Sequence, residues 1–255
     1  MTAGFAPEAR AVGRSLRIYH APGRAPVLDA FYRRFLSPGD LAFDIGAHAG
    51  DRTACFRRLG ARVVAVEPQP ALQRLLRRLF GKDPEVARMA ALVGATVGTA
   101  TLWINRRNPT ISTASADFIA ATGGAEGWEG QAWDQQLDRP VTTLDALAAA
   151  HGRPDFAKID IEGYEAVALR GLSFAPRALS FEFTTIQRDV ALECLKLLAA
   201  LGYRDFNVSL GESMVFAHPA PLDAQALAAY LTALPHAANS GDVYASTEPG
   251  RLTSN

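Results

Sequence analysis

Four residues between positions 44 and 67 have the types and spacing of a nucleoside-binding loop. Asp44 and Gly46 end a short apolar run, Gly50 follows shortly after, and Glu67 ends the next apolar run. Glycine lets the backbone approach a ligand closely, and an acid at the tip of the second strand of a dinucleotide-binding fold accepts ribose hydroxyls. Either glycine alone is compatible with a simple tight turn, but the combination predicts a nucleoside site.

The same loop lacks the features that a phosphate requires. A phosphate-binding P-loop needs a lysine after its last glycine, but Asp51 follows Gly50 here. A dinucleotide loop needs a glycine where this chain has His48. Asp44 and Asp51 would also repel a phosphate, whereas S-adenosylmethionine has an ammonium, a sulfonium and no phosphate. We therefore predict S-adenosylmethionine as the ligand of this loop.

The elements that must position these residues alternate in type along the chain. Strands are predicted from short apolar or β-branched runs at residues 41–45, 61–68, 86–93, 98–105, 154–163, 178–186, 203–209 and 213–219. Helices are predicted from apolar residues at helical spacing and from capping residues at residues 27–36, 52–60, 70–81, 142–152, 164–171, 189–202 and 221–235.

Because strands and helices alternate from residue 41 to residue 202, we predict a mostly parallel sheet with helices on both faces. The runs at 203–209 and 213–219 are expected to form an antiparallel pair that closes the sheet. The last ~15 residues are expected to be a frayed tail. Residues 105–140 lose all periodicity, which is typical of a lid or binding loop.

The composition excludes some classes of protein. The 255 residues include 26 Lys and Arg and 26 Asp and Glu, so the basic character of a nucleic-acid-binding protein is missing. No apolar run approaches the roughly 18 residues of a membrane span. Cys55 and Cys194 show neither a disulfide framework nor metal-ligand spacing, which favours a reducing, cytoplasmic location.

Several motifs together resemble a known family. D-I-G-A-H-A-G followed by V-V-A-V-E-P resembles the first two motifs of class I S-adenosylmethionine-dependent methyltransferases. The segments ALVGATVGTATLWIN, VTTLDAL, FAKIDIEGYEAVALRG and LSFEF resemble the FkbM family in particular, over about residues 40–217. The resemblance implies a Rossmann-like, seven-stranded, mostly parallel sheet with its last strand antiparallel. It also implies methyl transfer, usually to a hydroxyl on a sugar or a polyketide-like natural product.

The resemblance assigns cofactor contacts to individual residues. Those implied near the methionine end or the loop around it are Asp44, Gly46, Ala47, His48, Gly50 and Thr53. Glu67 would hold the ribose and Leu92 would lie near the adenine. His48 departs from the family, in which asparagine is frequent. A hydrogen bond from this ring to cofactor or acceptor and a bond that only orders the loop are both open.

The resemblance also places acidic residues where the methyl acceptor should lie. Lys158, Asp160 and Glu162 come at the end of the fourth strand, and Glu182 lies in the fifth. Lys158 and Asp160 share strand parity, so they should pair on one face. We expect Asp160 to lie nearest the methyl group and acceptor, as base or orienter, with Glu162 as the second choice. Carboxylates that face one cleft raise at least one pKa, as a base requires.

The same three carboxylates, those of Asp160, Glu162 and Glu182, are also ligands that Mg²⁺ accepts, so a metal site is an alternative. The predicted organisation is a helical lead-in over 1–37, a methyltransferase domain over 38–220 and a C-terminal helix and tail over 221–255. A hairpin and a lid are expected to be inserted near 99–140. Residues of this insertion that we expect to contact the acceptor are Ser112, Thr113, Ser115, Trp128 and Trp133.

The sequence thus predicts a methyltransferase that uses S-adenosylmethionine, releases S-adenosylhomocysteine and methylates a hydroxyl of a small molecule or glycan. One alternative is a module that binds S-adenosylmethionine or a nucleotide without turnover. A nucleic-acid methyltransferase is disfavoured because D-I-E-G-Y replaces the expected N/D-P-P-Y/F motif. A nucleotide-sugar dehydrogenase-like domain is disfavoured by His48. The identity of the acceptor, the need for metal and the oligomeric state stay open.

Overall fold

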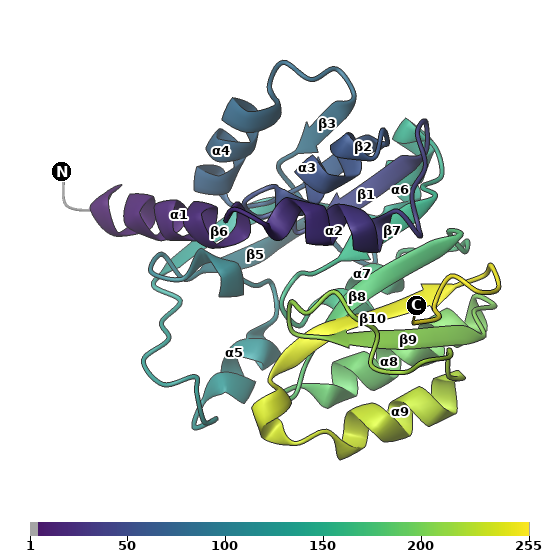
Figure 1. Ribbon diagram of the computed structural model, residues 1–255. Coiled ribbons are helices and arrows are strands. Elements are labelled where there is room, and N and C mark those ends of the chain that lie inside the picture. The colour runs from purple at the N-terminus through teal and green to yellow at the C-terminus, as the bar shows by residue number, and fades with distance from the viewer. Residues whose placement is uncertain (1–4, 255) are drawn as a thin grey trace.

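A seven-stranded sheet forms the centre of the computed structural model, which describes residues 5–254 (Figure 1). The strand order is β3-β2-β1-β7-β8-β10-β9. The strands are β1 (Leu41–Ile45), β2 (Arg62–Val66), β3 (Val86–Met89), β7 (Phe156–Ile159), β8 (Ala178–Thr184), β9 (Asp205–Leu210) and β10 (Ser240–Ser246). The first five strands in this order are parallel, and β10 is antiparallel to both of its neighbours. The predicted Rossmann-like sheet with its last strand antiparallel is therefore confirmed.

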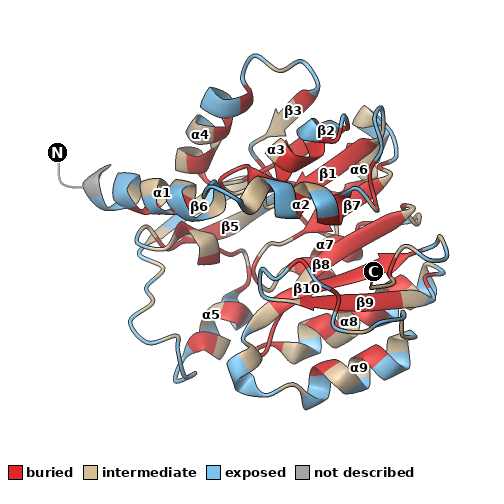
Figure 2. Cartoon of the chain, in the orientation of Figure 1, coloured by how far each residue is buried: buried red, intermediate tan, exposed pale blue. Residues whose placement is uncertain are grey.

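Helices cover both faces of this sheet. The helices of the described chain are α1 (Phe5–Tyr19), α2 (Arg24–Tyr32), α3 (Asp51–Arg58), α4 (Pro70–Phe80), α5 (Ala116–Thr122), α6 (Leu144–His151), α7 (Glu165–Leu169), α8 (Arg188–Ala200) and α9 (Ala224–Ala233). Apolar residues of α2, α3 and α4 pack into one core, and those of α6 to α9 pack into the other. Adjacent strand residues such as Ala42 and Phe43 face opposite cores, as the pleat requires. Figure 2 shows the central strands of this sheet almost wholly buried between the helices, whereas the edge strand β3 is mostly of intermediate burial.

A small second sheet follows β3. It contains β4 (Leu92–Val93), β6 (Gln135–Thr142) and β5 (Gly98–Ile104), in that order. The predicted strand over 86–93 is thus two strands in two sheets. The strand predicted over 98–105 is β5, but it pairs with β6, which begins only at Gln135, and not with β4, so the two strands that follow β3 do not form a hairpin with each other.

The expectation that 105–140 lacks regular structure is wrong for about half of that segment. It contains the 3₁₀ helix η1 (Pro109–Ile111), the helix α5 and most of β6. The sequence does not predict β6 because Pro140 lies inside it, and proline is rare within strands. Since β4 pairs only with Val141 and Thr142, most of β6 has a free edge, where proline is tolerated.

The C-terminal segment also differs from its prediction. The partner of β9 is β10 and not residues 213–219, and β10 lies inside the sheet within the expected frayed tail. Its apolar run is only Val-Tyr-Ala, and its strand conformation depends on pairing with the distant strands β8 and β9. The 3₁₀ helix η2 (His236–Ala238) leads into it, and the predicted helix near 221–235 is confirmed as α9.

The N-terminal lead-in consists of α1 and α2, with residues 1–4 outside the described part of the chain. Within residues 5–254, none of the helices combines the length and the apolar character needed to cross a bilayer.

Candidate active site

The carboxyl ends of the parallel strands open into a cavity of about 900 Å³, including its open mouth; we call it the first cavity. Ligands of open α/β sheets bind at this edge. The predicted site residues that line it are Asp44, Gly46, Ala47, His48, Glu67, Leu92, Ser112, Lys158, Asp160, Glu162 and Glu182. The fold thus brings most of the predicted cofactor and catalytic residues to one place.

The two glycines of the loop after β1 have different roles. Gly46 has a φ of 82°, and a Cβ built on it would lie 1.8 Å from the carbonyl oxygen of Asp160. Only glycine therefore lets this loop pass so close to the end of β7. Gly50 caps the N-terminus of α3 with a φ of 80° and does not line the cavity. Its function in the structure is to turn the chain into the helix.

Asp44 has one oxygen satisfied and one free. The Thr53 hydroxyl donates to its Oδ2 at 2.5 Å, so Thr53 orients Asp44 and lies behind the cavity wall. The Oδ1 atom is buried and has no hydrogen-bond partner among the described residues. Burial raises the pKa of Asp44, and the Lys158 ammonium partly opposes this. An unpartnered buried carboxylate oxygen beside a cavity suits a ligand ammonium.

Glu67 lies at the opposite side of the loop, at the end of β2. Its Oε2 accepts a bond from the His48 backbone N–H at 3.0 Å, and its Oε1 accepts one from the Gln69 N–H at 2.8 Å. Burial raises the pKa of Glu67 to about 7, although these backbone bonds favour the ionised form. Each oxygen keeps a lone pair, so the group can still accept two hydroxyl bonds. These two acceptor oxygens fit the hydroxyls of a ribose.

The wall beside Glu67 is apolar. Leu92 and Val93 of β4 and Leu102 of β5 line the first cavity and are buried. The small sheet therefore gives a surface suited to a planar base. Ser112 borders the same region, where its hydroxyl donates to Gln69 Oε1 at 3.0 Å.

The His48 ring is engaged by helix α1. Its Nε2 lies 3.3 Å from the Ser15 hydroxyl, and the ring makes a T-shaped contact with the Tyr19 ring at 5.0 Å between centroids. Burial lowers the pKa of His48 to about 4, so the ring is neutral at neutral pH. The contacts with Ser15 and Tyr19 support a role of His48 in ordering the loop. Because His48 also lines the first cavity, a hydrogen bond from it to a ligand is still compatible with the structure.

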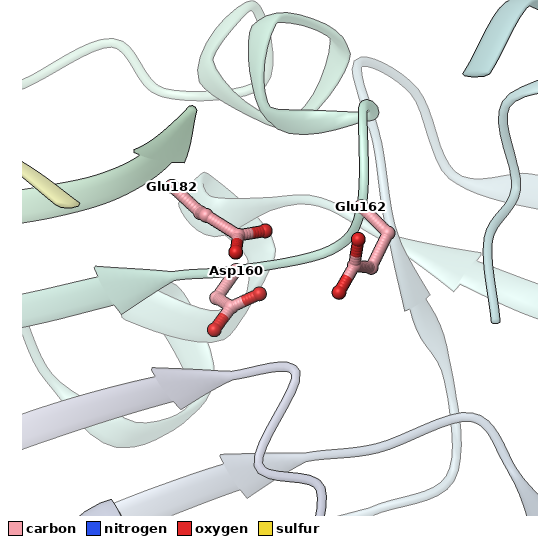
Figure 3. A group of neighbouring side chains, drawn as sticks. All are labelled: Asp160, Glu162 and Glu182. Carbon is pink, nitrogen blue, oxygen red and sulfur yellow. The ribbon is translucent and has the colours of Figure 1, made fainter. Parts of the chain in front are cut away.

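Three carboxylates gather just beyond β7 and β8; we call Asp160, Glu162 and Glu182 the acidic cluster. One oxygen from each lies within 4.8 Å of the others, and Figure 3 shows the groups turned toward one another. Lys158 Nζ donates to Asp160 Oδ2 at 2.5 Å. This pairing is the one that strand parity predicts.

The members of the acidic cluster differ in proton affinity. Burial and the neighbouring carboxylates raise the pKa values of Glu162 and Glu182 well above the usual range. Burial also acts on Asp160, but the Lys158 ammonium holds the pKa of Asp160 below its usual value. Glu165 is not part of the cluster and accepts a bond from the Ile161 N–H at 2.8 Å. The site therefore contains one carboxylate that favours the ionised form, Asp160, and two that favour the protonated form, Glu162 and Glu182.

A second cavity, of about 670 Å³, meets the first at the acidic cluster. Both cavities share the cluster, Tyr19, Thr110 and Glu212. The far wall of the second cavity includes Trp128 and Asp242. Two ligands, one bound in each cavity, would therefore meet at the acidic cluster.

The residues predicted to contact the acceptor divide into two groups. Trp128 lines the second cavity and Ser112 lines the first. The other three line neither cavity, and their polar groups form hydrogen bonds to the backbone. The Thr113 hydroxyl donates to the Glu162 carbonyl at 2.7 Å, Ser115 caps α5, and Trp133 Nε1 donates to the Ile111 carbonyl at 2.8 Å.

Residues without any sequence motif complete the site. Tyr19 comes from the last turn of α1, Glu212 from the turn after β9 and Asp242 from β10. Arg52 NH2 donates to Glu212 Oε2 at 2.6 Å, which ties that turn to α3. No spacing links these positions in the sequence, so only the fold reveals them.

Comparison with known proteins places the site within a family. The family model "Methyltransferase FkbM domain" matches residues 44–204, which include the glycine loop and the acidic cluster. No curated protein sequence matches the chain.

Solved structures with a similar arrangement include two methyltransferases. The magnesium protoporphyrin IX methyltransferase from Synechocystis PCC 6803, with bound SAM, is 12% identical, with a TM-score of 0.47 and coverage of 97% of this chain and 92% of that one. The precorrin-6y C5,15-methyltransferase from Geobacter metallireducens GS-15 is 14% identical, with a TM-score of 0.42 and coverage of 88% and 87%.

Proposed function

Because the chain belongs to the FkbM methyltransferase family and uses S-adenosylmethionine, we propose that it methylates a hydroxyl oxygen of a small molecule, such as a sugar, glycan or natural product. The observation that supports this most strongly is the position of the acidic cluster. It lies where the two cavities meet, and Lys158 fixes one of its carboxylates. A hydroxyl needs such a group to orient it and to receive its proton.

The first cavity would hold the methyl donor. S-adenosylmethionine supplies an electrophilic methyl carbon on a sulfonium, and transfer leaves a neutral thioether. The free Oδ1 of Asp44 suits its ammonium, and the two Glu67 oxygens suit its ribose. The apolar wall around Leu92 suits its adenine.

The second cavity would hold the acceptor. Asp160, kept ionised by Lys158, would accept a hydrogen bond from the acceptor hydroxyl and fix its direction. Glu182, when ionised, would take the proton as the oxygen gains the methyl carbon, and its raised pKa makes the ionised carboxylate a stronger base. Glu162 is the other candidate for this proton because its pKa is raised in the same way. Trp128 offers an aromatic face to a sugar or ring.

A screen with methyl-¹³C S-adenosylmethionine against sugars, glycosides and hydroxylated natural products tests the proposal. The carbon chemical shift distinguishes a methyl ether from an N-methyl or C-methyl product. We expect a methyl ether that forms with wild-type protein and with E193Q, in which a partly exposed carboxylate of α8 that pairs with Arg170 is neutralised. Label transferred only to nitrogen or carbon would contradict the proposed O-methylation.

A further inference from the structure

We propose that the acidic cluster binds one divalent metal cation, with open coordination positions that face the second cavity. Transfer of a methyl group to a hydroxyl does not itself require a metal, so this inference goes beyond the proposed function. It rests on the geometry, the burial and the charge of Asp160, Glu162 and Glu182.

The geometry allows all three carboxylates to reach one ion. Bonds from carboxylate oxygens to Mg²⁺ or Ca²⁺ are about 2.0–2.6 Å long, so two ligands of one ion lie at most about 5 Å apart. One oxygen from each of Asp160, Glu162 and Glu182 lies within 4.8 Å of the others. Figure 3 shows that the groups come from a loop and from a neighbouring strand, with their oxygens facing a common space.

Glu162 provides a second observation that points to a ligand. The residue is only 6% exposed, and within residues 5–254 its carboxylate forms no hydrogen bond or ion pair. Its backbone is held in place by the Thr113 hydroxyl, which donates to the Glu162 carbonyl at 2.7 Å. A carboxylate that is buried, unpartnered and turned toward both cavities is costly unless a positive group joins it.

The charge of the cluster matches a divalent ion. When ionised, three carboxylates and the Lys158 ammonium leave a net charge of −2. Asp242, which pairs with Glu182 across β8 and β10, adds negative charge from the other side. Among the described residues, Lys158 is the one basic side chain that forms an ion pair with the cluster.

The ligand chemistry selects hard metals. All the donors are carboxylate oxygens, without histidine or cysteine, which favours Mg²⁺, Mn²⁺ or Ca²⁺. If each carboxylate binds through one oxygen, Asp160 Oδ2 stays on Lys158 and Glu182 keeps an oxygen for the acceptor proton. The remaining positions would take two neighbouring oxygens of the acceptor, as in a vicinal diol or a hydroxy acid.

Titration of Mn²⁺, followed by electron paramagnetic resonance, tests the site in the full chain after removal of metals with EDTA. It is run with and without S-adenosylhomocysteine, so the metal result does not depend on the donor site. We expect Mn²⁺ at a single site, displaced by Mg²⁺. E162Q and E182Q should each weaken binding at least tenfold. E129Q neutralises an exposed carboxylate between α5 and β6 and should leave binding unchanged.

Thermal melts of each variant confirm that it is folded. No bound Mn²⁺ in either titration of the wild-type protein would overturn the inference. Equal affinity in the wild type and in both glutamine variants would also overturn it. Failure of the wild type to bind S-adenosylhomocysteine would count against the proposed function instead, because the metal ligands lie outside the Asp44 and Glu67 contacts.

Discussion

The two cavities that meet at the acidic cluster differ in how their residues are distributed along the chain. The first takes its polar wall mainly from residues 44–69 and 158–164, the loops that follow three adjacent parallel strands. The second adds Trp128 and Asp242 from two separate segments that do not line the first. The first cavity can therefore be recognised from local motifs, whereas the second exists only once distant segments have folded together. Variants that act on one cavity and not the other test this division.

The largest loss of activity is expected from a substitution in the acidic cluster, where the two cavities meet. In D160N the side chain keeps its size and its hydrogen-bond acceptor toward Lys158 but loses its negative charge. We expect kcat to fall by about 10²–10⁴, the range of general acid–base catalysis. S-adenosylhomocysteine affinity should change by less than threefold. Activity assays with calorimetry measure both, and an unchanged kcat would remove Asp160 from the chemistry.

A smaller effect is expected at the far wall of the second cavity. Trp128 contacts Phe118 edge-on, at 5.5 Å between ring centroids, and presents its remaining surface to this cavity. W128A should raise the acceptor KM roughly fivefold, since an aromatic stack contributes about 1 kcal/mol. W133F is the matched control because Trp133 lines neither cavity and donates its bond to Ile111. Equal KM values for W128A and wild type would contradict the placement of the acceptor.

The smallest effect concerns pH at the first cavity. Because burial raises the pKa of Glu67 to about 7, lowering the pH from 8 to 6 protonates a group that should accept ribose hydroxyls. S-adenosylhomocysteine affinity should fall up to about tenfold over this interval, and E67Q should show a flat profile.

The contribution of Glu67 to the stability of the fold has the opposite dependence on pH. A folded pKa above the unfolded value of 4.5 stabilises the protein at low pH, and this is lost as pH rises through about 7.

Calorimetry at several pH values measures the affinity profile, and urea melts at pH 5 and 8 measure the stability. A wild-type affinity that is independent of pH would mean that Glu67 does not contact the ligand or stays ionised throughout.

The sequence predicts the parallel half of the fold and the first cavity well because the information there is local. The motif around Gly46 indicates a close approach, and the structure explains it, because a Cβ at this position would lie 1.8 Å from the Asp160 carbonyl oxygen. The parity of Lys158 and Asp160 is likewise enough to predict their ion pair. Glu67 ends its strand where the fold class places a ribose acceptor.

The C-terminal half could not be predicted in the same way. The strand β10 has a short apolar run, and its partners are set by pairing with segments far away in the chain. Its Asp242 therefore lies in what the sequence presents as a tail. Tyr19 and Glu212 also reach the site only through tertiary contacts, such as the bonds from Arg24 and Arg52 to Glu212. The sequence indicates that Thr113 and Trp133 are near the site but not that their polar groups bond the backbone carbonyls of Glu162 and Ile111 instead of a ligand.

Calorimetric titration of S-adenosylhomocysteine into wild type, E67A and D242N tests the central division most directly. The account predicts micromolar binding by the wild type and an affinity at least tenfold lower for E67A, about 1.4 kcal/mol. D242N changes only the second cavity, so its affinity should match the wild type. No binding by folded wild-type protein, or equal losses in E67A and D242N, would contradict the assignment of the first cavity to the methyl donor.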